Sequence, residues 1–202
     1  MKYFEHESAA TFDEAVSLLK ESPKGKTVVM AGGSDLIGVL KEQILEDYPE
    51  KVVDLKTVRG GEYIKQDGDT IEIGALTKLC DIVKSDLLNE KAPVLSQAAR
   101  SVATPLIRNV ATMGGNICQD VRCWFYRYPH GIGGRMDCMR KGGKECYAVM
   151  GDNRYHSIFG GMKVHTTPCS VQCPANTDIP AYMERLREGD VEGAAHILME
   201  AT

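Results

Sequence analysis

The chain has 202 residues, 43% of them hydrophobic, and a formal net charge of −4 at pH 7. This length allows one sizeable domain with a small appendage or two small domains, and the apolar fraction is that of a folded globular protein. The negative charge and a pI near 5.8 argue against a general nucleic-acid binder. The N-terminus has no apolar signal region, and no run approaches the roughly 20 apolar residues of a membrane span, so we expect a cytoplasmic protein.

Short strands and helices alternate at the start of the chain. Thr11 is the expected N-cap of the first helix, because acidic residues follow it in the first turn. The β-branched run at 27–30 is typical of a strand. Expected strands cover 2–5, 27–30 and 52–55, and expected helices cover 11–21 and 36–45. This order indicates an α+β fold that begins with a small parallel unit.

A hairpin and two helices are expected next. The segments 63–65 and 70–73 flank Gln66-Asp67-Gly68-Asp69, which is a strong hairpin signal. Helical patterns then cover 76–84 and 93–102. Cys80 shares the first of these patterns with apolar residues, so we expect it to be a buried small hydrophobe.

Two glycine-rich segments could present backbone amides to a phosphate. The segment 31–35, AGGSD, stands between an expected strand and an expected helix, where free amides attract anions. An ordinary turn with Ser34 or Asp35 as N-cap explains the same pattern. The segment lacks the GxGxxG and GK[ST] spacings, which disfavours Rossmann and P-loop sites. A second segment, 112–116, adds a hydroxyl and a carboxamide to two glycines.

Seven cysteines without a secretory signal indicate metal or redox chemistry, since structural disulfides are rare in reducing compartments. Four of them lie in a basic loop with little periodicity, within 118–156. Thiolates suit iron–sulfur clusters, and imidazole can replace one of them. Zinc is the alternative metal, although no CxxC pair is present. The basic residues form either a solvated surface or charge compensation for thiolates. The four cysteines are Cys118, Cys123, Cys138 and Cys146.

Three motifs resemble, in order and spacing, the FAD-binding domain of molybdenum-hydroxylase flavoproteins, a family that includes the medium subunits of carbon monoxide and xanthine dehydrogenases. They are AGGSDLIG at 31–38, IGALTKL at 73–79 and PLIRNVATMGGNI at 105–117. The resemblance covers about residues 1–118 and implies a two-lobed α+β domain of the PCMH type, shared with vanillyl-alcohol oxidases. It implies that FAD binds at both glycine-rich segments. The residues carried over are Ala31, Gly32, Gly33, Ser34 and Asp35 for the diphosphate, and Thr112, Gly115 and Asn116 from the second lobe.

The cysteine-rich loop is similar to the insertion in the flavin subunit of 4-hydroxybenzoyl-CoA reductase, where four cysteines carry a [4Fe–4S] cluster. The matching residues are Arg122, Cys123, Cys138, Lys141, Gly142, Gly143 and Cys146. The fourth cysteine of that pattern falls at about Tyr155, beside His156. The likeness therefore implies a [4Fe–4S] cluster on the three matching cysteines, with His156 or Cys118 as the fourth ligand.

The segment 162–202 resembles the N-terminal iron–sulfur region of glutamate-synthase small subunits and dihydropyrimidine dehydrogenases. Cys169-x3-Cys173-Pro, Asp178-Ile179-Pro180 and paired helices split at Gly189-Asp190 carry this likeness. The usual neighbouring cysteine pair is missing, so a helical hairpin with two inert thiols is the alternative. The C-terminal domain usual in the flavoproteins is missing too, which predicts a truncated chain or a subunit completed by another chain.

Together these patterns predict an FAD-dependent dehydrogenase subunit that transfers electrons within a multi-subunit oxidoreductase. Residues 1–161 would bind FAD and carry the cluster in loop 118–156, and residues 162–202 would form a helical docking segment. Expected partners are molybdopterin, iron–sulfur or NAD(P)H-oxidising subunits, with NAD(P) or ferredoxin as acceptor. We nominate no acid–base catalytic residue, because the protein positions and tunes its cofactors. The alternative is a zinc-stabilised or cofactor-free scaffold.

Overall fold

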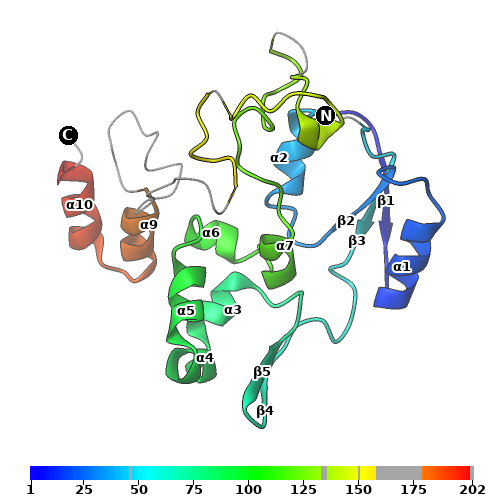
Figure 1. Ribbon diagram of the computed structural model, residues 1–202. Coiled ribbons are helices and arrows are strands. Elements are labelled where there is room, and N and C mark those ends of the chain that lie inside the picture. The colour runs from blue at the N-terminus through cyan, green and yellow to red at the C-terminus, as the bar shows by residue number, and fades with distance from the viewer. Residues whose placement is uncertain (46, 133–135, 150, 158–178, 201–202) are drawn as a thin grey trace. The chain divides into compact units, whose positions relative to one another are not determined.

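The computed structural model describes residues 1–45, 47–132, 136–149, 151–157 and 179–200 (Figure 1). The chain forms two compact units, residues 1–61 with 114–163 and residues 62–113 with 164–202. The chain leaves the first unit after Gly61 and returns to it at Gly114. The domain boundary expected at residue 161 lies outside the described residues and stays a prediction.

The first unit begins with a three-stranded parallel sheet, as the sequence predicts. The strands β1 (Glu5–Ser8), β2 (Thr27–Met30) and β3 (Lys51–Asp54) lie in the order β1-β3-β2. The central β3 buries Val52 and Val53 completely. The expected strand at 2–5 is wrong, because pairing with β3 begins only at Glu5, whose N–H donates to the carbonyl of Glu50 at 2.7 Å.

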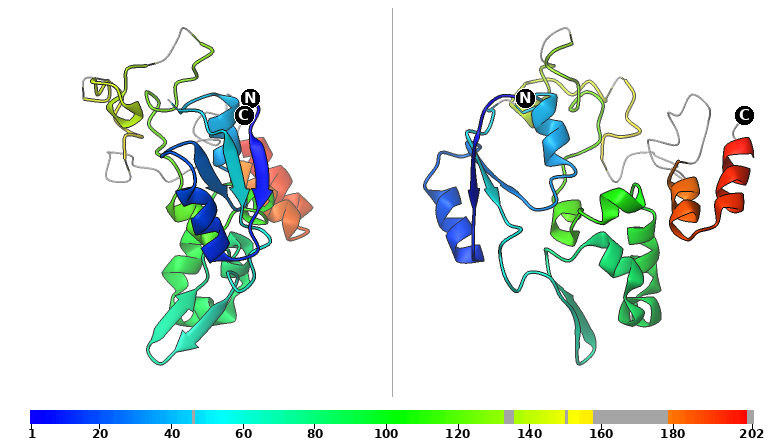
Figure 2. Two further views of the ribbon diagram at one scale, coloured as in Figure 1. Left: turned by 90° about the vertical axis from the view of Figure 1, so that its right-hand side faces the viewer. Right: turned by 180° about the vertical axis from the view of Figure 1, so that it is seen from behind.

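Two helices accompany this sheet, and Figures 1 and 2 show them on opposite sides of it. Helix α1 (Phe12–Lys20) begins where the Thr11 hydroxyl accepts from the Glu14 N–H, which confirms the predicted cap. Helix α2 (Leu36–Lys41) is shorter than expected. It stops before Gln43, whose φ of +52° lies in the left-handed region that ends helices. The short helices α7 (Met113–Ile117) and η1 (Met139–Lys141) follow later in the chain.

The second unit contains the predicted hairpin and a group of short helices. The hairpin strands are β4 (Ile64–Asp67) and β5 (Thr70–Ile73), paired antiparallel. The helices are α3 (Leu79–Lys84), α4 (Asp86–Lys91), α5 (Pro93–Arg100) and α6 (Pro105–Arg108). Helix α3 starts later than expected because Lys78 is extended and bridges to Thr112. Helix α4 was not expected, and it begins where the Ser85 hydroxyl accepts from the Leu88 N–H.

The C-terminal part of the second unit is a helical hairpin, α9 (Ile179–Arg187) and α10 (Val191–Glu200), which pack against each other (Figure 2). The chain turns between them at Gly189, with a φ of +79°, as the sequence predicts for this pair. Cys169 and Cys173 lie outside the described residues. Among the helices that the structure describes, none is both long and apolar enough to cross a membrane.

Candidate functional site

The first glycine-rich segment forms a tight turn between β2 and α2. Gly33 has a φ of +70°, which non-glycine residues rarely adopt. A Cβ at this position would lie 3.0 Å from Ile37 Cδ1 and 3.1 Å from Met30 Sδ. The carbonyl of Gly33 accepts from the Ile37 N–H at 3.0 Å, so the turn leads directly into the helix. The backbone conformation therefore favours glycine here, and an added Cβ would also crowd the ends of two side chains.

Asp35 occupies the N-cap position of α2 but makes no capping hydrogen bond with its side chain. Its carboxylate turns instead toward the cysteine-rich loop. Oδ1 lies 2.8 Å from Arg127 Nη2 and 2.9 Å from Arg122 Nη1, and Oδ2 accepts from the Asp120 N–H at 2.9 Å. Asp35 therefore stands at the N-cap position, but its side chain does not cap the helix as the sequence suggested.

The second glycine-rich segment is a helix rather than an open turn. Thr112 is buried and pairs with Lys78 in an isolated bridge, and the Met113 N–H donates to the Thr77 carbonyl at 2.8 Å. Gly115 and Asn116 follow in α7. Thr112 belongs to the second unit, whereas the other predicted FAD contacts belong to the first.

The predicted metal ligands line one pocket of the first unit. A cavity of about 220 Å³ is bordered by Cys123, Cys138, Cys146 and His156, together with apolar and charged side chains of the same loop. Cys146 Sγ lies 3.7 Å from His156 Nε2. Cys118 is exposed and is not among the residues that line this pocket. Of the two candidates for the fourth ligand, the structure places His156 with the three cysteines.

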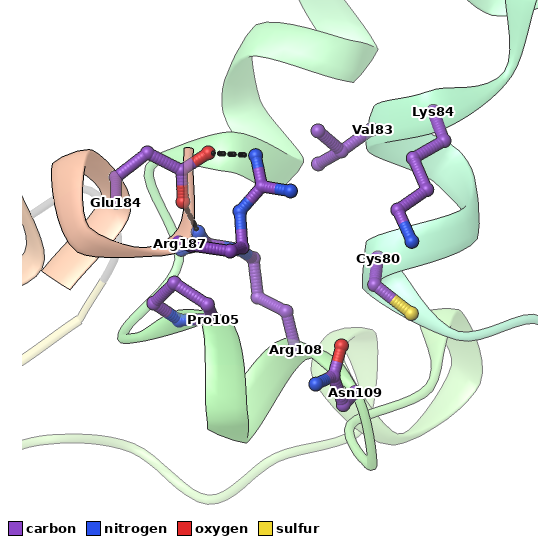
Figure 3. Close-up of a pocket in the computed structure, with 8 residues that line it drawn as sticks. All are labelled: Cys80, Val83, Lys84, Pro105, Arg108, Asn109, Glu184 and Arg187. Carbon is purple, nitrogen blue, oxygen red and sulfur yellow. Dashed lines mark hydrogen bonds and ion pairs between the residues drawn. The ribbon is translucent and has the colours of Figure 1, made fainter. Parts of the chain in front are cut away.

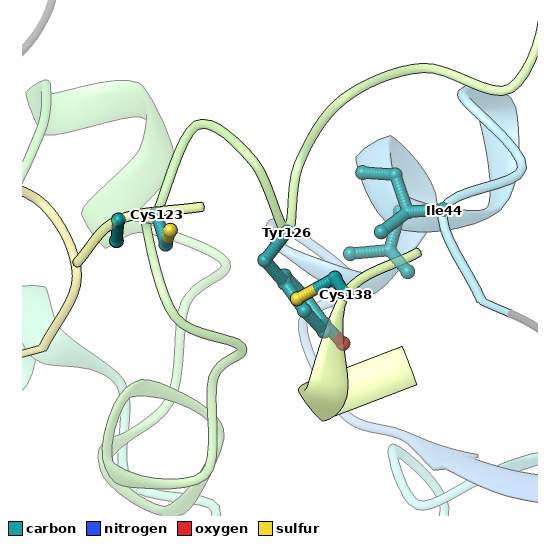
Figure 4. Close-up of a cluster of buried hydrophobic side chains, with 6 residues drawn as sticks. Ile44, Cys123, Tyr126 and Cys138 are labelled. Atoms are coloured by element: carbon teal, nitrogen blue, oxygen red, sulfur yellow. The ribbon is translucent and has the colours of Figure 1, made fainter. Parts of the chain in front are cut away.

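The thiols of Cys123 and Cys138 are deeply buried, with 4% and 7% of their residue surface exposed. They share a hydrophobic cluster with Ile44 and Tyr126 (Figure 4). Burial raises the pKa of the Tyr126 hydroxyl, and its contact with the carboxylate of Asp120 raises it further. The cysteines therefore lie in a weakly hydrated environment, which would shield a bound cluster from water.

Two glycines shape the turn between Cys138 and Cys146. Gly142 has a φ of +80°, and a Cβ on Gly143 would overlap the backbone of Asp137. The Glu145 N–H donates to the Asp137 carbonyl at 3.1 Å, which closes the turn. The Lys-Gly-Gly sequence at 141–143 thus brings the segments that carry the two cysteines close together.

An aromatic stack covers another part of the loop. Trp124 and Tyr155 lie parallel, with ring centroids 5.6 Å apart and an interplanar angle of 12°. Arg154 lies over both rings and also forms an ion pair with Asp152. This stack joins the residue after Cys123 to the residue before His156, and so it holds two predicted ligands in the same part of the loop.

The donor chemistry of the pocket fits an iron–sulfur cluster. The cysteines in the described part of the chain, Cys169 and Cys173 lying outside it, form no disulfide. Three thiols and one imidazole are ligands that iron–sulfur clusters accept. Within the described ranges, no three His, Cys, Asp or Glu side chains converge closely enough to hold one metal ion.

A second pocket, of about 210 Å³, lies in the second unit (Figure 3). Its central residue is Arg108, whose side chain is only 4% exposed. Nη1 donates to the carbonyls of Val102 and Ala103, and Nη2 donates to Glu184 at 2.5 Å. These bonds tie α6 to the loop before it and to α9, which is a structural role. Cys80 borders the same pocket. It is half-buried, whereas the sequence predicted a fully buried side chain, so that prediction is only partly correct.

Residues 2–139 match the family described as FAD binding domain in molybdopterin dehydrogenase. The chain belongs to this family. Its mixture of helices and strands and the glycine-rich turn at 31–35 agree with the fold and the cofactor expected from the sequence motifs.

Relatives within this FAD-binding family align with part of their length. The FAD-subunit of nicotinate dehydrogenase from Eubacterium barkeri is 34% identical over 117 residues, 58% of this chain and 39% of that subunit. The aldehyde oxidoreductase FAD-binding subunit PaoB of Escherichia coli K12 is 29% identical over 161 residues, 79% of this chain and 48% of that subunit. The structure of carbon monoxide dehydrogenase from Hydrogenophaga pseudoflava aligns with a TM-score of 0.55 and 31% identity, over 57% of this chain and 39% of that one. The chain thus spans less than half the length of these relatives.

Sequence reasoning about this FAD-binding domain missed the contacts of Asp35. The motif suggested a diphosphate ligand, and nothing in the spacing linked residue 35 to Arg122 or Arg127. The only signal was the excess of basic residues in the loop, which the sequence explains equally well by surface exposure.

Proposed function

We propose that this chain is an electron-transfer subunit that holds FAD and one [4Fe–4S] cluster within a molybdenum-hydroxylase-type dehydrogenase. The observation that carries the proposal is the pocket that gathers Cys123, Cys138, Cys146 and His156 in a chain of an FAD-binding family. Flavins exchange one or two electrons and clusters exchange one, so the two groups together suit a junction between redox partners.

The FAD would bind at the two glycine-rich segments. Ala31, Gly32, Gly33 and Ser34 would hold the diphosphate through the turn before α2, where the left-handed Gly33 allows the backbone to approach the ligand. Asp35 would contribute through its backbone, since its carboxylate is engaged by arginines. Thr112, Gly115 and Asn116 would contact the cofactor from the second segment.

The cluster would bind in the pocket of the cysteine-rich loop. Cys123, Cys138 and Cys146 would supply thiolates and His156 an imidazole, which shifts the potential relative to four thiolates. The basic residues of the loop offset negative charge, and Arg140 borders the pocket directly. The match with PaoB supports a loop that is shared with a relative. A stretch of 79% of a 202-residue chain includes the loop from Cys118 to His156 wherever it begins.

The working protein would be a complex. Several relatives are named as subunits or medium chains of dehydrogenases, and this chain spans 39% of the first of them. Molybdopterin, iron–sulfur or NAD(P)H-oxidising chains would be its partners, and NAD(P) or ferredoxin its acceptor. Residues 165–202 would serve as a docking segment. Deletion of these residues should abolish co-purification with the larger subunits, and unchanged co-purification would contradict this role.

An absorption spectrum of the anaerobically purified protein, with metal and sulfide analysis, tests the cofactor content. We expect flavin bands on a broad iron–sulfur shoulder, with iron and acid-labile sulfide in equal amounts. Zinc without sulfide would instead indicate the zinc-stabilised module, and neither flavin nor metal would indicate a cofactor-free scaffold.

A further inference from the structure

One carboxylate joins the glycine-rich turn to the cysteine-rich loop. Asp35 receives three donors, and all three come from residues 120–127. Asp35 and Arg127 are largely buried, with 18% and 20% of their side chains exposed. A pair shielded to this degree is weakened by solvent far less than a surface ion pair.

Arg127 also organises the turn that presents Cys123. Its Nε donates to the Val121 carbonyl at 2.8 Å, and its Nη2 donates to the Asp120 carbonyl at 3.0 Å. Its backbone N–H donates to the Cys123 carbonyl at 2.8 Å. The guanidinium that holds Asp35 therefore also fixes the backbone just before a proposed cluster ligand, and the backbone N–H of the same arginine closes the turn after it.

The charges of this contact link the folding of the loop to the binding of FAD. An FAD diphosphate at the 31–35 turn would place negative charge beside the Asp35 carboxylate, and like charges at close range repel. Arg122 and Arg127 neutralise that carboxylate only when the loop is folded against it. A loop that is ordered by its cluster would therefore favour diphosphate binding, and a disordered loop would leave the repulsion uncompensated.

We propose that Asp35 is a positioning residue that couples FAD binding to cluster binding through Arg122 and Arg127. This inference rests on the proposed function, because it takes the flavin and cluster sites from it. By linkage, whatever factor the cluster adds to FAD affinity, FAD adds to cluster affinity. Cofactor loading would then be cooperative, and cluster-free protein would still bind FAD but with lower affinity.

The test measures the FAD dissociation constant in cluster-loaded protein and in the cluster-free Cys138→Ala variant, each with and without Asp35→Asn. The native residue should give FAD affinity at least about fivefold tighter with the cluster than without it, within the usual range of such couplings. In Asp35→Asn this ratio should fall to about one. The cluster-free Asp35→Asn protein should bind FAD more tightly than cluster-free protein with Asp35, because the variant lacks the carboxylate that repels the diphosphate.

That sign separates coupling from a merely structural role, since loss of a structural contact would weaken FAD binding in both backgrounds. Arg127→Gln in cluster-loaded protein should act in the opposite direction and weaken FAD binding. Asp54→Asn is the matched control, because Asp54 is a buried carboxylate of the same unit whose ion pairs, among the described residues, are with His6 and Lys56 and not with the loop. It should leave the ratio unchanged.

Two outcomes would overturn the inference, and they separate failure of the coupling from failure of the proposed function. Native protein that holds both cofactors but binds FAD equally with and without the cluster would refute the coupling and leave the proposed function intact. Native protein that contains no acid-labile sulfide would refute the proposed cluster and the coupling with it.

Discussion

Arg108 Nη2 lies 2.5 Å from Glu184 Oε2, and this contact attaches the C-terminal hairpin to helix α6. Arg108 is buried and uses Nη1 for backbone carbonyls, so Glu184 is the carboxylate that balances its charge. Arg187 and Arg100 contact the same carboxylate. The hairpin is therefore held within its own unit by charge as well as by the contacts of α9 with α6.

Replacing Glu184 with Gln should loosen the hairpin. Loss of the charged partner of a buried guanidinium is expected to cost about 1.5–3 kcal/mol of local stability. Hydrogen exchange of the α9 amides would report this as faster exchange, while the β1–β3 amides stay protected. Glu188→Gln is the control, since Glu188 is 44% exposed and lies 3.6 Å or more from its arginines. Equal exchange in the two variants would contradict the account.

The same contact predicts a dependence on pH. The hydrogen bond from Arg187, with the nearby charges of Arg108 and Arg100, lowers the pKa of Glu184 below its ordinary value of 4.5, although burial opposes this. A depressed folded-state pKa means that the stabilisation is complete above about pH 4.5 and is lost as the pH falls through the folded-state value. Protection of α9 should therefore decrease in acid in the native protein and should vary less in Glu184→Gln. A native hairpin equally protected on both sides of that range would count against this prediction.

Gly33→Val should abolish flavin binding in a folded protein. Valine is strained at a φ of +70°, and its side chain would collide with Ile37 and Met30 in the turn that would meet the diphosphate. Gly38→Ala is the matched control in the adjacent helix, because nothing lies within 4 Å of its added Cβ and alanine favours helix. Flavin content after gel filtration gives the comparison. Full occupancy in folded Gly33→Val would contradict the placement of FAD.

His156 should matter to the metal more than Cys118 does. His156 lines the pocket and lies 3.7 Å from Cys146 Sγ, whereas Cys118 is exposed outside it. We expect His156→Ala to lose most of its iron and Cys118→Ala to keep it, as measured by metal analysis after anaerobic purification. His156→Cys should restore binding with a lower cluster potential, since a thiolate replaces a neutral ligand. The reverse order of iron loss would assign the fourth ligand to Cys118.

Removal of the metal should loosen the cysteine-rich loop selectively. The segment between Cys138 and Cys146 is held by a few turn hydrogen bonds and exposes Arg140 and Lys144 to solvent. Chelation should therefore accelerate tryptic cleavage after these two residues by about tenfold or more, since metal binding contributes folding free energy. Cleavage near the α1 residue Lys20 serves as the internal reference. An equal change at both places would indicate general unfolding.

Local chemistry made much of this fold predictable. The Thr11 cap, the strand at 27–30 and the hairpin at 64–73 follow from propensities within a few residues of each element. The start of β1 and the end of α2 were misplaced because pairing with β3 and the left-handed Gln43 decide them. Such long-range pairing and backbone choices leave no strong local pattern.

The candidate site was likewise predictable only in part from the sequence. Motif order indicated the FAD-binding family, which the match over residues 2–139 establishes. Sequence spacing left the fourth ligand open between His156 and Cys118. The folded loop places His156 in the pocket and Cys118 outside it, and the identity of the ligand stays a prediction. The engagement of Asp35 by Arg122 and Arg127 spans about 90 positions of sequence and depends on tertiary structure alone.

The most direct test of the account is the cofactor stoichiometry of the anaerobically purified chain beside its Cys138→Ala variant. We predict one FAD, four iron and four sulfide per native chain, and little iron or sulfide in the variant, whose retained flavin shows that the FAD fold persists. Native protein with flavin but no sulfide, or a variant that keeps its full iron and sulfide, would contradict a cluster in this pocket.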